Sequence, residues 1–107
     1  MYHIYDTYMK KKQALERKIQ KIKEELMEIG EMRPGSLSVQ KRRWGGQYHQ
    51  LSYTHQGKGR TEYVPDTQIK EIEQQLDNYR RFKKLVQNWV TLGIELCKLK
   101  SKPGGKP

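Results

Sequence analysis

The strongest constraint on this chain is an apolar repeat in its first third. Between positions 15 and 29, apolar side chains recur in steps of four, three, four and three residues, at Leu15, Ile19, Ile22, Leu26 and Ile29. Apolar residues at this spacing line one face of an α-helix and form the seam of a coiled coil. The repeat therefore predicts a long amphipathic helix over residues 6–29, which must bury this seam against another element.

The composition makes that burial decisive for stability. Only 34% of the 107 residues are apolar and the formal net charge is +10, a combination more typical of disordered chains. The single cysteine, Cys97, excludes an internal disulfide and a metal site built from several thiolates. We therefore expect stability to come from helix packing or from self-association.

A second apolar repeat predicts another long helix over residues 67–100, preceded by Pro65 and capped by Asp66 or Thr67. At ~1.5 Å per residue it would be about 50 Å long, against about 36 Å for the first helix. Its repeat slips by one residue near Phe82, so the helix either bends there or turns its buried face toward a second partner. That partner would be a sheet or a second copy of the chain, and the unmatched helix lengths predict a homodimer.

Between the two helices, residues 36–64 are rich in β-branched and aromatic residues and contain two turns marked by glycine. We predict a three-stranded antiparallel meander with strands over residues 36–42, 47–55 and 60–64. Tyr48 and Tyr63 fit either face of this sheet. The side chains expected to face the core are Leu37, Val39, Leu51, Tyr53 and Val64.

The expected fold class is therefore α+β. A long helix is followed by a three-stranded antiparallel β-meander and a second long helix, and the two helices pair as an antiparallel, coiled-coil-like hairpin. Residues 1–100 would form a single domain, and residues 101–107 a flexible basic tail.

The positive charge is distributed unevenly along the chain. Residues 1–31 hold seven bases and six acids, residues 32–65 six bases and one acid, and residues 66–107 nine bases and five acids. In the middle segment the bases flank the two predicted turns, and in the second helix four bases surround Phe82. With the tryptophan next to the first turn, these residues are Lys41, Arg42, Arg43, Trp44, Lys58, Arg60, Arg80, Arg81, Lys83 and Lys84.

These ten residues are the candidate nucleic-acid-binding set, because lysine and arginine neutralise phosphates and aromatic rings stack on unpaired bases. The pattern does not distinguish DNA from RNA as the partner. In the alternative interpretation, the aromatic residues belong to the core of a small sheet and the bases only solvate its rim and the helix surface. Tyr53 and Tyr63 fit this alternative better than stacking, whereas Trp44 fits both equally.

Other chemistry has little support in the sequence. Glu62 and Asp66 beside Lys70 resemble a nuclease cluster only faintly, and His49 and His55 have no third metal ligand near them. We therefore expect a protein that is not an enzyme, with no metal and no cofactor. No apolar run approaches the length of a membrane span, and the first residues lack the pattern of a signal peptide. The sequence thus predicts a cytoplasmic protein without membrane contact.

Five segments carry a resemblance to a known family: residues 32–40 (Met-Arg-Pro-Gly-Ser-Leu-Ser-Val-Gln), 48–54, 57–60, 63–65 and 78–85 (Asn-Tyr-Arg-Arg-Phe-Lys-Lys-Leu). Together they resemble a family of small uncharacterised prokaryotic proteins with a domain of unknown function, often found near transposases and other mobile elements. The resemblance implies a Cys-rich insert, similar to a zinc knuckle, between the first two strands.

Here the residues at positions 41–46, Lys-Arg-Arg-Trp-Gly-Gly, stand in place of that insert and contain no cysteine. This departure leaves a basic hairpin without the cysteines that would hold the implied metal. The predicted function is thus a non-catalytic nucleic-acid-binding accessory protein of a mobile element or a larger nucleoprotein complex. It would use the basic hairpin and the basic helix segment on the phosphate backbone. The alternative is a helical adaptor or inhibitor that docks on such a complex through protein contacts.

Overall fold

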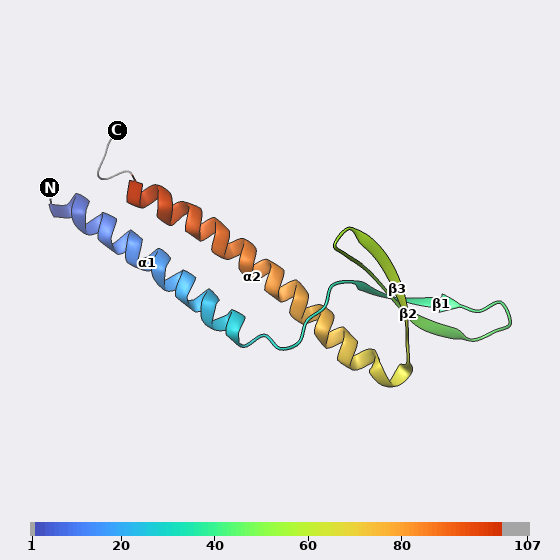
Figure 1. Cartoon of the computed structure of the whole chain (residues 1–107). Coiled ribbons are helices and arrows are strands. Elements are labelled where there is room, and N and C mark those ends of the chain that lie inside the picture. The colour runs from blue at the N-terminus through green and yellow to red at the C-terminus, as the bar shows by residue number, and fades with distance from the viewer. Residues whose placement is uncertain (1, 102–107) are drawn as a thin grey trace. The chain divides into compact units, whose positions relative to one another are not determined.

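The order of elements is helix, three strands, helix, as the sequence predicts. A computed structural model describes residues 2–101, with side chains from residue 5 onward. The elements are α1 (Tyr2–Met27), β1 (Ser36–Lys41), β2 (Gln47–His55), β3 (Lys58–Val64), a short 3-10 helix η1 (Asp66–Gln68) and α2 (Ile69–Ser101) (Figure 1). No helix in the described part of the chain is long and apolar enough to cross a membrane.

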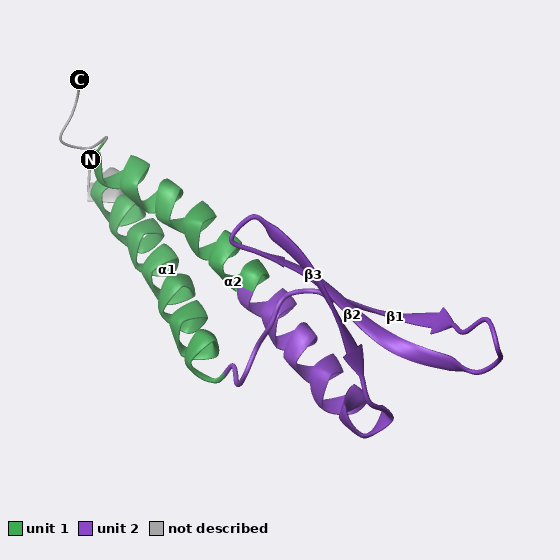
Figure 2. Cartoon of the chain, turned by 45° about the vertical axis from the view of Figure 1, so that its right-hand side comes forward, with its two compact units in different colours: residues 1–28, 83–107 green, residues 29–82 purple. Residues whose placement is uncertain are grey.

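The chain forms two compact units. Unit 1 consists of residues 1–28 and 83–107, and unit 2 of residues 29–82 (Figure 2). Helix α2 contributes its C-terminal part to the first and its N-terminal part to the second. The slip in the apolar repeat near Phe82 coincides with this division. The buried face of α2 therefore changes its partner at the slip.

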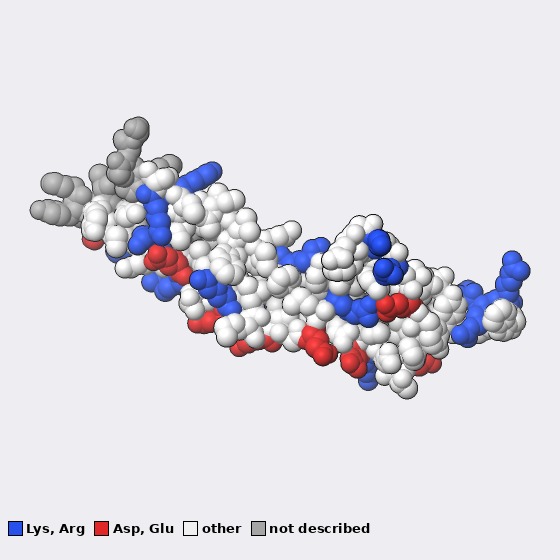
Figure 3. Space-filling model, viewed as in Figure 1, with Lys and Arg blue, Asp and Glu red and all other residues white. Residues whose placement is uncertain are grey.

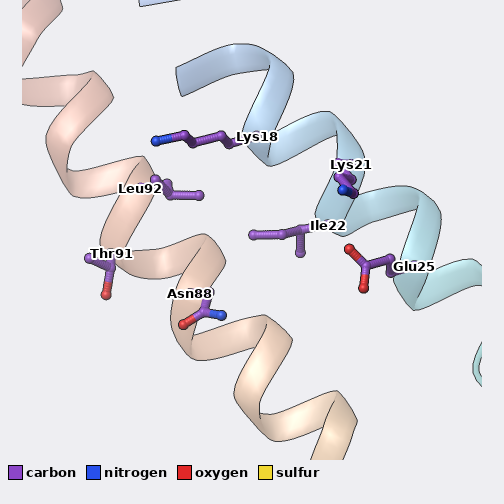
Figure 4. A pocket seen from close by; sticks show the side chains of 7 residues that line it. All are labelled: Lys18, Lys21, Ile22, Glu25, Asn88, Thr91 and Leu92. Atoms are coloured by element: carbon purple, nitrogen blue, oxygen red, sulfur yellow. The ribbon is translucent and has the colours of Figure 1, made fainter. Parts of the chain in front are cut away.

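Unit 1 is an antiparallel pair of helices, which confirms the predicted hairpin. Two grooves between α1 and α2 show that the helices run in opposite directions. Leu15 lines one groove together with Leu99, and Ile22 lines the other together with Leu92, so residue numbers rise along α1 as they fall along α2. In Figure 4, Ile22 and Leu92 extend toward each other from the two helices. The buried side chains of this unit are Leu15, Ile19, Ile22 and Leu85.

Unit 2 contains the sheet, whose strands lie in the order β1-β2-β3 and pair antiparallel. Strand β3 begins at Lys58, two residues before the predicted start. Gln56 and Gly57 form a two-residue turn with φ of 52° and 78°, and positive φ at both positions is typical of a type I′ turn. This tight turn lets Lys58 pair with His55, so Gly59 belongs to the strand and not to the turn.

The first turns of α2 cover one face of this sheet. Leu51, Val64, Ile72 and Leu76 form the buried cluster, with Leu37, Tyr53 and Ile69 packed around it. The sheet is thus one partner of the second helix, as expected. The predicted core position of Val39 is wrong, because its side chain is 52% exposed. Val39 lies farther along an edge strand than Leu37, where the β1–β2 hairpin extends past the helix (Figures 1 and 2).

Within unit 2, the segment that follows α1 is hydrogen-bonded to α2 through Glu31 and Arg33. The Asn78 side-chain amide donates a 2.7 Å hydrogen bond to the backbone oxygen of Glu31. The backbone N–H of Arg33 donates to the backbone oxygen of Gln75 at 3.2 Å, and the Gln75 side chain donates to the Glu31 carboxylate at 3.3 Å. Three hydrogen bonds therefore hold the entry to the sheet against the helix that leaves it.

The C-terminal end of α2 differs slightly from the prediction. Ser101, expected as the first residue of a flexible tail, is the last residue of the helix, and its hydroxyl donates to the backbone oxygen of Lys98 at 3.0 Å. The rest of the predicted tail, residues 102–107, lies outside the described residues.

Candidate nucleic-acid interface

The two faces of the sheet differ sharply in chemistry. The pairing register is regular from Ser36 to Val64, so side chains alternate strictly between the faces. The face that carries Leu37, Leu51 and Val64 packs against α2. The opposite face, here called the outer face, bears hydroxyl, amide and aromatic groups and no aliphatic or charged side chain. Its residues are Ser36, Ser38, Gln40, Tyr48, Gln50, Ser52, Thr54, Gly59, Thr61 and Tyr63.

A compact basic loop joins β1 to β2 at the end of the hairpin. The backbone N–H of Arg42 donates to the oxygen of Gly46 at 3.0 Å, and that of Gly45 donates to the oxygen of Arg42 at 3.2 Å. These bonds close a turn that needs φ of 103° and 78° at the two glycines. Trp44 lies at the tip, and 83% of its surface is exposed.

Aromatic rings and cations meet at this end of the sheet. The ring centroids of Tyr48 and Tyr63 are 6.2 Å apart with an interplanar angle of 37°. The Arg42 guanidinium carbon lies 5.0 Å from the Tyr48 centroid, a cation–π contact that orients the arginine. Six residues, called the hairpin cluster, line an open depression of about 400 Å³: Lys41, Arg42, Arg43, Trp44, Tyr48 and Tyr63.

The hairpin cluster contains three cations and no acid. Figure 3 shows lysine and arginine atoms gathered at this end of the hairpin, at the right of the view. The single acid among residues 32–65, Glu62, lies on the other face of the sheet. The depression therefore offers positive charge and aromatic surface together, which suits a phosphate joined to a base.

Lys58 and Arg60 are not part of this cluster. They lie in the first half of β3, near the β2–β3 turn, and neither lines the depression. The register places both side chains on the face that packs against α2. Arg60 there pairs in register with Tyr53, beside the carboxylate of Glu62.

Tyr53, Glu62 and Arg33 form a small network on that face. The Tyr53 hydroxyl donates to a Glu62 carboxylate oxygen at 2.8 Å, and the Arg33 guanidinium donates to the other oxygen at 3.3 Å. Arg33 also lies 5.0 Å above the Tyr53 ring. The hydrogen bond from Tyr53, with the charges of Arg33 and Arg60, holds the pKa of Glu62 below its ordinary value, although burial acts in the opposite direction. The same hydrogen bond, together with burial, raises the pKa of Tyr53.

This network predicts a pH-dependent contribution to stability. Because its folded-state pKa is lowered, Glu62 stabilises the fold above its ordinary pKa and loses that contribution as the pH falls through the folded value. In an NMR titration, we expect the Glu62 carboxyl to have a midpoint below 4.5 and Tyr53→Phe to move that midpoint upward. An unchanged Glu62 titration in Tyr53→Phe would show that the hydrogen bond does not set the pKa.

None of the four helix bases lines the depression at the hairpin. Arg80 donates to the Asp77 carboxylate at 2.7 Å, and Arg81 and Lys83 interact with other groups of the chain. Arg80 and Arg81 lie on the part of α2 within unit 2, which packs against the other face of the sheet. Lys83 and Lys84 belong to unit 1. Of the ten candidate residues, only Lys41, Arg42, Arg43 and Trp44 are thus brought together.

Two members of the hairpin cluster, Tyr48 and Tyr63, were missing from the sequence-based set. The sequence left their face open and favoured a core position for Tyr63, which is wrong because its side chain is 62% exposed. The polar residues at alternate positions from Ser36 to Gln40 and from Gln50 to Thr54 are the signal that identifies the outer face. Tyr48 continues this polar alternation on β2, so the register places it among these groups.

The histidines do not form a metal site in the described part of the chain. The Nδ1 atom of His49 is buried without a hydrogen-bond partner and lies 3.9 Å from a carboxylate oxygen of Asp66. His55 is exposed at the end of β2. Among the residues with described positions, no three His, Cys, Asp or Glu side chains lie close enough together to bind a metal ion.

The sequence model of a domain of unknown function, DUF6788, matches residues 12–74, which is more than half of the chain. The matched range starts within α1, contains the whole sheet and the hairpin cluster, and ends in the second turn of α2. The segment 78–85, which contributed to the resemblance seen in the sequence, lies beyond it. No curated protein and no solved structure matches the chain.

Proposed function

We propose that this chain, which belongs to the DUF6788 family, is a non-catalytic nucleic-acid-binding accessory protein whose contact surface is the hairpin cluster. One observation carries the proposal: three cations and three aromatic rings line one open depression that contains no acid. The proposed setting is a mobile element or a larger nucleoprotein complex in the cytoplasm. The basic segment of α2 has a lesser role here than the sequence indicated, because its arginines do not line this depression.

The chemistry of the cluster fits the backbone and the bases of a nucleic acid. Each phosphate that a lysine or arginine neutralises releases counterions, so the affinity falls as salt is added. With three cations in contact, the slope of log K against log salt would be about −2 to −3. The exposed rings add stacking energy that a purely electrostatic surface lacks.

Fluorescence anisotropy tests this proposal directly. Labelled duplex DNA, single-stranded DNA and structured RNA are titrated with the protein at low and at near-physiological salt. We expect binding to at least one of them with the stated salt slope. A protein that binds none of the three at low salt, and that purifies with the ultraviolet spectrum of clean protein, would refute the proposal.

The homodimer expected from the helix lengths is a separate proposal, and an exposed stripe on α2 favours it. Val90 and Ile94 lie one helical turn apart in unit 1, and both are about half exposed. A Cβ at Gly93, between them, would meet no atom, so a partner helix has room to approach closely. The partner in this proposal is a second copy of the chain, which would bury the stripe in a homodimer.

Sedimentation tests the homodimer. At micromolar concentration we expect the wild type to sediment as a dimer and the double variant Val90→Lys/Ile94→Lys as a monomer, because buried charges at a helix interface oppose association. Lys10→Ala/Arg17→Ala, which changes exposed residues on α1, should remain dimeric. A monomeric mass for the wild type would exclude this role for the stripe.

A further inference from the structure

We infer that the nucleic acid bound by this protein is single-stranded and that it lies across the outer face of the sheet. This inference rests on the proposed function and specifies its substrate class. Its basis is the position of Tyr48 and Tyr63 on the outer face of the sheet, where they line one depression with Trp44 beside uncharged polar groups.

The exposed rings are suited to unpaired bases. Trp44 is 83% exposed and Tyr63 is 62% exposed, and both line the depression with Tyr48. The ring centroids of Tyr48 and Tyr63 are 6.2 Å apart and the ring planes are tilted by 37°, so the two rings are not stacked in parallel on each other. Bases within a duplex are already stacked on their neighbours, whereas unpaired bases are free to stack on aromatic side chains. Three rings in one depression therefore favour a single strand.

The rest of the outer face offers hydrogen bonds and no charge. Gln40 donates from its side-chain amide to the Ser38 hydroxyl at 3.1 Å, and Ser38 donates to the backbone oxygen of Gln50 at 3.4 Å. Amides and hydroxyls both donate and accept, as the edges of bases do. Phosphates, in contrast, are best bound by cations. The uncharged polar side chains next to the rings thus suit the edges of bases. The three cations at the hairpin tip suit the phosphate backbone of the nucleic acid.

The dimensions set the expected length of the bound strand. The outer face extends along β2 from the hairpin tip to the β2–β3 turn, a distance of about 27 Å at ~3.4 Å per residue. A face of this length matches the lower part of the ~4–16 nucleotide range of small single-strand-binding domains. Duplex binding would instead place the hairpin itself in the major groove and leave Tyr63 without a base to stack on.

The test compares a 12-nucleotide single strand, as DNA and as RNA, with the duplex of the same sequence. Anisotropy is measured for the wild type, Trp44→Ala, Tyr63→Ala and the conservative Tyr63→Phe. Both alanine variants should fold, because both side chains are mostly exposed. We expect each to weaken single-strand binding about fivefold or more, with Tyr63→Phe close to the wild type. The matched control is Tyr5→Ala on α1, a tyrosine that is 65% exposed and should leave the affinity unchanged.

The outcomes separate this inference from the proposed function. If the wild type prefers the single strand and the ring deletions remove that preference, the inference holds. If duplex and single strand bind equally and Trp44→Ala and Tyr63→Ala change neither affinity, the inference is wrong while the proposed function stands. If the wild type binds none of the probes at low salt, the proposed function itself is wrong.

Discussion

Replacing Arg42 and Arg43 by alanine is expected to lower the affinity for nucleic acid about tenfold or more at near-physiological salt. Arg43 is exposed at the hairpin tip, and Arg42 is oriented by the Tyr48 ring, so both present their charges at the same depression. Removing two phosphate contacts should also reduce the salt slope by about 1.5 to 2. Because phosphates carry no sequence information, the loss should be similar for all probe sequences.

The matched control removes the same charge from another place. Lys10→Ala/Arg17→Ala deletes two exposed bases of α1, in unit 1, and should change the affinity by less than about twofold. Equal losses in the two double variants would mean that net charge alone, and not the hairpin, attracts nucleic acid. Full binding by the Arg42/Arg43 variant would show that the hairpin does not contribute to nucleic-acid binding. Circular dichroism of both variants checks that the fold is intact.

Leu51→Ala is expected to have the largest effect on stability. Leu51 is fully buried at the centre of the middle strand, where it packs with Val64, Ile72 and Leu76. Replacing a buried leucine by alanine costs about 2–5 kcal/mol, and a small domain often has only about 5–15 kcal/mol of stability in total. Urea denaturation followed by circular dichroism should show a large fall in the midpoint, or unfolding of unit 2 without denaturant.

Val39→Ala is the natural control for this substitution. Val39 lies on the same face of the sheet but is 52% exposed and does not belong to the buried cluster. Its replacement removes little buried surface and should cost less than about 1 kcal/mol. Comparable losses for Val39→Ala and Leu51→Ala would contradict the position assigned to the core.

Periodicity was enough to predict the architecture. The apolar steps from Leu15 to Ile29 and from Ile69 to Leu99 predict both helices and their pairing, and the slip near Phe82 marks the place where the partner of α2 changes. Periodicity does not reveal how far a packing surface extends. Val39 has the correct alternation for the core and is still exposed, because the helix covers only the neighbouring part of the sheet.

The candidate site was predictable in composition and not in geometry. The basic run of residues 41–43 next to Trp44 is visible in the sequence, but its pairing with Tyr48 and Tyr63 depends on strand register. Register also places Lys58 and Arg60 near the β2–β3 turn, and neither lines the depression. The register of β2 and β3 follows from the turn geometry at Gln56 and Gly57, which local composition does not specify.

The three hydrogen bonds from Gln75, Asn78 and Arg33 also bear on the order of folding. Unit 1 is assembled from segments near the two ends of the chain. For its helices to meet, the roughly 54 residues of unit 2 must close into a loop. For a flexible loop of this length, the entropic cost of closure is about 3.5 kcal/mol. Unit 2 is continuous in sequence, and these bonds bring its entry and exit together. Formation of unit 2 first would remove most of that closure cost, and the helix pair would then form as a local, fast step.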